Sequence, residues 1–79
     1  MSAYKDEWID LLLKQKLPGW LIANDKNHIF INVPEDQDLE TAMEDFIARV
    51  KLLKPKVKAK PAKLSFFIGN SKDSKFYEL

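Results

Sequence analysis

Cysteine is absent from this sequence of 79 residues, and histidine occurs once, as His28. Disulfides and thiolate metal sites are therefore excluded. The two glycines, Gly19 and Gly69, belong to neither a phosphate-binding loop nor a dinucleotide-binding motif. No stretch groups a nucleophile with a base and an oxyanion donor. We therefore predict a protein that is not an enzyme and that uses no cofactor and no metal.

Long apolar runs are missing as well. No run approaches the roughly 18–20 residues that span a bilayer. The first ten residues are charged from Lys5 onward and lack the apolar core of a signal peptide. We therefore expect no membrane partner and a cytoplasmic location.

Charge is nearly balanced in total but unevenly distributed. The formal net charge is +1, yet six of the twelve acidic residues lie between positions 35 and 45. Between positions 46 and 72 there is no acidic residue, and eight of the thirteen basic residues lie there. Such asymmetry can mark an interaction surface.

Two stretches have helical periodicity. Tyr4, Trp8 and Leu12 recur at helical spacing after a potential cap at Ser2, and Pro18-Gly19 ends this first helix. The clearest helix spans residues 36–54, with Asp36 or Asp38 as its N-cap and Pro55 after its end. Its apolar residues alternate spacings of four and three: Leu39, Met43, Phe46, Val50 and Leu53.

Four short stretches alternate with period two and predict strands at residues 20–24, 28–33, 63–69 and 75–79. One face of the resulting sheet holds Ile29, Ile31, Phe66 and Ile68, beneath the second helix. We predict an α+β fold, a single small domain over residues 1–79 with the order α-β-β-α-β-β. Its four-stranded, mostly antiparallel sheet has the 36–54 helix packed on it.

The lysine-rich segment of residues 49–63 carries the main functional hypothesis. If it is extended, its lysines lie on one side and Val57 and Ala59 on the other. The first hypothesis is a small non-enzymatic protein that binds DNA or RNA, mostly electrostatically and with weak sequence specificity. The predicted contacts are Arg49, Lys51, Lys54, Lys56, Lys58, Lys60 and Lys63.

The alternative hypothesis is a protein-protein interaction module, such as an adaptor, a subunit or a small inhibitor of a larger machine. The lysines would then only protect an edge strand, or a crossing loop, against pairing with another chain. The wide apolar face of the first helix further suggests a homodimer, because so short a chain buries little surface on its own.

The second face of the sheet is the remaining open question. Phe30, Phe67 and Tyr77, or Phe76 in place of Tyr77, would offer a surface for stacking bases, with His28 beside them. Alternatively the first helix covers this face in a three-layer α-β-α domain, or another protein does.

Overall fold

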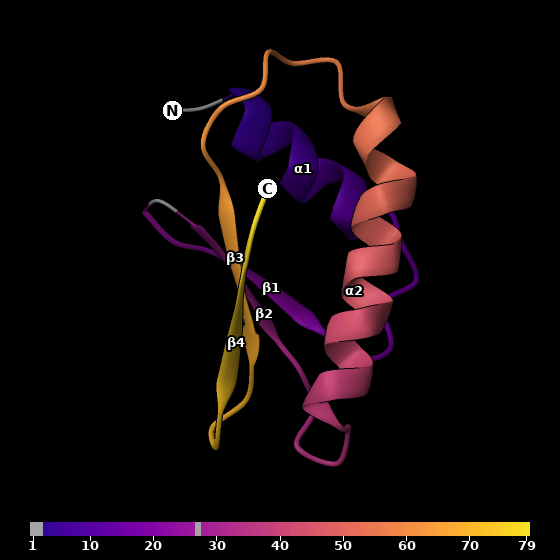
Figure 1. The fold of residues 1–79 in the computed structure, drawn as a ribbon, viewed down its shortest axis with the longest axis vertical. Helices are drawn as coiled ribbons and strands as arrows, with labels where there is room; N and C mark the ends of the chain where they lie inside the picture. Colours follow the sequence, from indigo (N-terminus) through magenta and orange to yellow (C-terminus); the bar gives the residue numbers. More distant parts are fainter. Residues whose placement is uncertain (1–2, 27) are drawn as a thin grey trace.

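The computed structural model describes residues 3–26 and 28–79 and contains the predicted order of helices and strands (Figure 1). Ser2, the predicted cap of the first helix, lies outside the described residues. The elements are α1 (Ala3–Leu13), β1 (Leu21–Asn24), β2 (His28–Asn32), α2 (Leu39–Leu53), the short 3-10 helix η1 (Lys54–Lys56), β3 (Ser65–Gly69) and β4 (Ser74–Glu78).

The strands form one sheet in the order β1-β2-β3-β4. β1 with β2 and β3 with β4 are antiparallel, whereas the central pair, β2 with β3, is parallel. A parallel pair needs a long crossover, and α2 lies within it. The mostly antiparallel four-stranded sheet is therefore confirmed, with one parallel pair at its centre.

Both helices cover the same face of the sheet (Figure 1). Trp8 of α1 and Phe46 of α2 each meet the ring of Phe66 on β3, at centroid distances of 6.0 and 4.9 Å. All three rings are fully buried. The three-layer alternative, in which the first helix covers the face of Phe30 and Phe67, is wrong, because α1 lies on the side of the sheet that carries Phe66.

The apolar stripe of α2 packs on this sheet as its spacing predicts. Ala42, Phe46 and Val50 are buried, and Met43 is partly buried at the margin of the core. Asp38 caps the helix, since its Oδ2 accepts hydrogen bonds from both the backbone N–H and the hydroxyl of Thr41. Asp36 is therefore not the cap, and the helix begins later than position 36.

The hairpin between β3 and β4 depends on Gly69. A Cβ atom built on this residue would lie 2.4 Å from the backbone oxygen of Asp73. The chain can therefore double back only where a side chain is missing. This close return sets the register in which Phe76 lies beside Phe67.

No helix in the described part of the chain is both long and apolar enough to span a lipid bilayer.

Candidate functional site

The sheet face opposite the helices carries a row of apolar side chains. Strand register places Ala23, Phe30, Phe67 and Phe76 opposite one another across β1, β2, β3 and β4. Side chains alternate between faces along a strand, so this row lies on the side away from Phe66. We call Phe30, Phe67 and Phe76 the aromatic row.

The ring of Phe67 contacts an aromatic ring on each side, whereas Phe30 has no ring contact among the described residues. The centroid of the His28 imidazole lies 4.6 Å from that of the Phe67 ring, and the two ring planes are inclined at 75°. On the side of Phe67 away from His28, the centroid of the Phe76 ring lies 5.1 Å from that of Phe67, with an interplanar angle of 59°. Phe76 is 54% exposed, while Phe30 and Phe67 are half-buried. Aromatic surface of this kind remains accessible to a ligand on the open face.

Tyr77 does not belong to the aromatic row, which corrects the prediction that included it. Its ring lies 6.3 Å from that of Phe46, and it packs against the core on the helix side. Register pairs Tyr77 with the buried Phe66, and Phe76 with Phe67. Phe76 therefore occupies the place in the aromatic row that the prediction gave to Tyr77.

Few charges lie directly on the open face. The alternation of β4 places Glu78 there and Lys75 beneath the helices, paired with Ile68. At the end near β1, His28 Nε2 lies 3.1 Å from Asp25 Oδ2. The Lys26 N–H bonds to the Asp25 carboxylate and, with a smaller contribution from His28, lowers its pKa. Any positive charge that attracts phosphates to the open face must therefore come from the loops around the sheet.

The lysine-rich segment leaves α2 as η1 and then continues as a loop outside the sheet. The edges of the sheet are β1 and β4, so the interpretation as a protected edge strand is wrong. The segment is a crossing loop, and alternate residues differ as expected. Lys56, Lys58 and Lys60 are exposed, whereas Val57 and Ala59 pack against the core.

The Glu7 carboxylate anchors this loop to α1. Its two oxygens accept hydrogen bonds from the backbone N–H groups of Lys58 and Ala59, at 2.9 and 2.8 Å. These bonds lower the pKa of Glu7, with the Lys58 N–H contributing most. Because the backbone faces Glu7, the lysine side chains are free to point outward.

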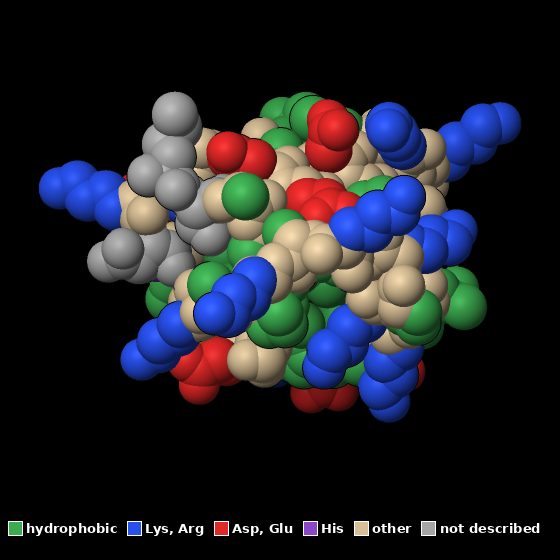
Figure 2. Space-filling model, turned by 90° about the horizontal axis from the view of Figure 1, so that it is seen from above, with side chains coloured by type: hydrophobic (Ala, Val, Ile, Leu, Met, Phe, Trp, Pro, Cys, Tyr) green, Lys and Arg blue, Asp and Glu red, His purple; other side chains and the backbone are tan. Residues whose placement is uncertain are grey.

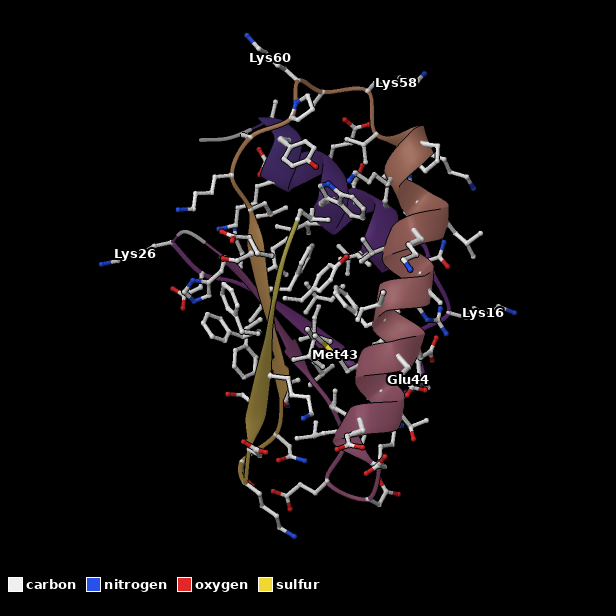
Figure 3. The ribbon with its side chains drawn as sticks, viewed as in Figure 1. Lys16, Lys26, Met43, Glu44, Lys58 and Lys60 are labelled. Carbon is white, nitrogen blue, oxygen red and sulfur yellow. The ribbon has the colours of Figure 1, made fainter. Side chains whose placement is uncertain are left out.

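The lysines form no dense cluster. Lys58 and Lys60 project outward at the end of the molecule that lies beyond α1 (Figure 3). Lys26 projects outward from the turn between β1 and β2. Seen from this end, lysine side chains stand apart, with acidic and apolar side chains between them (Figure 2). Lys54 and Lys63 are also exposed. Such an arrangement gives weak, diffuse attraction for phosphates.

Arg49 and Lys51 lie on α2 rather than on the loop. The Arg49 Nε donates to Asp45 Oδ1 at 2.9 Å, and its guanidinium carbon lies 5.7 Å from the centroid of the Trp20 ring. Lys51 is exposed. Arg49 is thus engaged within its own chain, and the structure does not join it to the aromatic row.

Two features of this region were not predicted. The Glu7 anchor joins positions 51 and 52 residues apart, and no local pattern in the sequence signals it. Alternation along the sequence offers Phe76 only in place of Tyr77. The pairing of β4 with β3 would have identified it, had the hairpin register been known.

The apolar residues of α1 serve the chain's own core. Tyr4, Trp8 and Leu12 are buried, while Leu13 is 63% exposed. Their burial removes the reason for expecting a second copy on this helix. A homodimer stays an untested prediction.

Within residues 3–26 and 28–79, no group of three or more His, Asp and Glu side chains is placed to hold a metal ion. No protein-family model, curated protein or solved structure matches this chain.

Proposed function

We propose that the open sheet face binds single-stranded DNA or RNA, by stacking bases on Phe30, Phe67 and Phe76. The observation that supports this most is the register of the aromatic row on adjacent strands, with both helices on the opposite face. Bases of a single strand can splay onto such rings, whereas bases within a duplex cannot. The proposal therefore includes a preference for single strands.

Stacking supplies most of the binding free energy in this proposal. Each base stacked on an aromatic side chain contributes about 1–3 kcal/mol, and every base has a suitable face. Sequence preference is therefore weak. The exposed lysines of the crossing loop, which leads directly into β3, attract phosphates and add a modest dependence on salt.

The test is a fluorescence-anisotropy titration of labelled oligo-dT, oligo-U and a duplex of equal length. Phe76→Ala should weaken single-strand binding at least about fivefold, because a stacked base is lost. Phe76 is more than half exposed, so the variant should fold, and circular dichroism checks this. Leu52→Ala, at a 73% exposed position on α2, is the matched control.

Unchanged single-strand affinity in a folded Phe76→Ala variant would overturn the proposal. Equal or tighter binding of the duplex would also contradict it, because the rings could not reach the bases. Loss of affinity in Leu52→Ala to the same degree would show that the effect is not specific to the open face.

A protein-interaction module is the second candidate. The observation in its favour is that the strands present no Lys or Arg on the open face, while Leu21, 67% exposed, extends its apolar surface at β1. The same titration separates the two. Absence of oligonucleotide binding, with Phe76→Ala lowering self-association in sedimentation, would favour a protein partner.

A further inference from the structure

A hollow with a volume of about 390 Å³ lies where the crossing loop passes α1. Its lining residues come from α1, η1, the loop and the chain beyond β4: Tyr4, Lys54, Val57, Ala59, Pro61, Ala62 and Leu79. Small-molecule sites commonly span roughly 300–1,000 Å³. The hollow shares no residue with the aromatic row, and the following inference does not rest on nucleic-acid binding.

The walls of this hollow are fixed by contacts outside it. Glu7 holds the loop through the N–H groups of Lys58 and Ala59. The N–H of Leu79 donates to the backbone oxygen of Leu64 at 3.1 Å. Tyr4 packs edge-on against Trp8, at a centroid distance of 6.3 Å. A ligand would therefore meet a largely pre-formed site.

The polar groups of the hollow suit an anion. Lys54 is its only charged lining side chain, and it forms no ion pair with any residue that the structure describes. The hydroxyl of Tyr4 likewise makes no hydrogen bond within the described chain. No acidic side chain lines the hollow, and no ion pair joins Lys54 to the backbone carboxylate at Leu79, where the described residues end. An ammonium group and a hydroxyl thus remain available beside apolar walls.

We propose that this hollow binds a small carboxylate with an apolar body. The apolar part lies against Val57, Ala59 and Pro61, where it displaces water from apolar surface. The carboxylate accepts a charge-assisted hydrogen bond from Lys54. The exposed Lys56 and Lys58 on the same segment add to the positive potential that favours an anion.

Octanoate and its neutral analogue octanamide are suitable probes, because they differ only in the group that meets Lys54. Titration of the ¹⁵N-labelled chain, followed by heteronuclear NMR, should shift the amides of residues 57–60, of Ala62 and of Leu79. Octanoate should bind about tenfold more tightly than octanamide, because hydrogen bonds to charged groups are stronger than neutral ones.

Three variants complete the test. Lys54→Gln should weaken octanoate about tenfold and leave octanamide unchanged, since only the charge-assisted bond is lost. Lys51→Gln, exposed on α2 and outside the hollow, removes the same charge as a control. Ala59→Leu should weaken both probes, because its larger side chain occupies the space.

Equal affinity for the two probes would overturn the proposal. So would amide shifts confined to the open sheet face, or an equal effect of Lys54→Gln and Lys51→Gln. Unchanged binding to a folded Ala59→Leu variant would likewise show that the ligand lies elsewhere.

Discussion

The imidazole of His28 on β2 lies nearly edge-on to the ring of Phe67 on β3, with 4.6 Å between the ring centroids. The two residues are diagonal neighbours, because His28 pairs with Ser65 in the parallel ladder and Phe67 stands two positions further along. With Phe76 on the far side of Phe67, ring surface continues across β2, β3 and β4. This continuity supports the proposed stacking of bases on the open face.

The exposed lysines of the crossing loop should set the salt dependence of binding. Replacing Lys56, Lys58 and Lys60 together by Gln removes up to three phosphate contacts. For single strands each contact contributes about −0.7 to the slope of log K against log salt. The slope should therefore become shallower by up to about two units, in titrations at several salt concentrations.

The triple change Lys14→Gln, Lys16→Gln and Lys72→Gln is the matched control. It lowers the net charge equally at exposed positions outside the loop. Equal slopes for the two triple variants would show that the loop has no special role. New self-association of the loop variant with unaltered binding would favour protection against chain pairing.

Phe46 should be essential to the core. Its side chain is fully buried and meets both Phe66 and Tyr77. Phe46→Ala should lower the free energy of unfolding by about 3–5 kcal/mol, measured by urea denaturation. Leu52→Ala, on the exposed side of the same helix, should change it by no more than about 0.5 kcal/mol. A loss below about 1 kcal/mol at Phe46 would contradict its placement.

Substitutions of Asp38 and Asp36 distinguish the effect of a helix cap from the effect of negative charge near the start of α2. Asp38 accepts two hydrogen bonds from Thr41, whereas Asp36 makes none within the described chain. Asp38→Ala should therefore cost about 1 kcal/mol of unfolding free energy. Asp36→Ala should lower the unfolding free energy clearly less, and urea denaturation of both variants measures the difference. Equal losses would mean that only the charge near the helix end matters.

The Glu7 anchor should make stability depend on pH. The loop N–H groups lower the pKa of Glu7 in the folded chain, so the unfolded chain binds a proton more readily. The stabilisation is present above the ordinary carboxyl pKa of about 4.3 and is lost as pH falls through the folded pKa. Glu7→Gln should therefore lower the melting temperature at pH 7 and have less effect near pH 3.

Glu44→Gln is the control for this comparison. Glu44 is exposed on α2 and has no hydrogen bond or ion pair within the described residues (Figure 3). The Glu44→Gln variant should have the same melting temperature as the unaltered chain at both pH values. A Glu7→Gln effect that is equally large at pH 3 would show that the carboxylate is not what anchors the loop.

The sequence by itself determined the elements and their order, because these depend on local periodicity. The stripe containing Phe46 and Val50 has the period of a helix, and Phe66 and Ile68 have the period of a strand. Those patterns also predicted which face of β2 and β3 is buried. The Asp38 cap followed from its place before the stripe, although Asp36 satisfied the same pattern.

Only the tertiary structure decided where α1 lies and which aromatic residue of β4 faces outward. Tyr4, Trp8 and Leu12 would form an apolar stripe on either face of the sheet. Phe76 and Tyr77 are adjacent, so each face of β4 receives one aromatic ring and alternation cannot rank them. The hairpin register closing at Gly69 makes that choice.

The path of the lysine loop was also decided by distant contacts. The Glu7 carboxylate accepts hydrogen bonds from the backbone N–H groups of Lys58 and Ala59. These bonds can form only when α1 packs next to the loop. Local periodicity depends on neighbours within a few residues, whereas these contacts depend on how complete elements pack. The candidate surfaces therefore follow from packing geometry, which a single sequence does not encode in any short pattern.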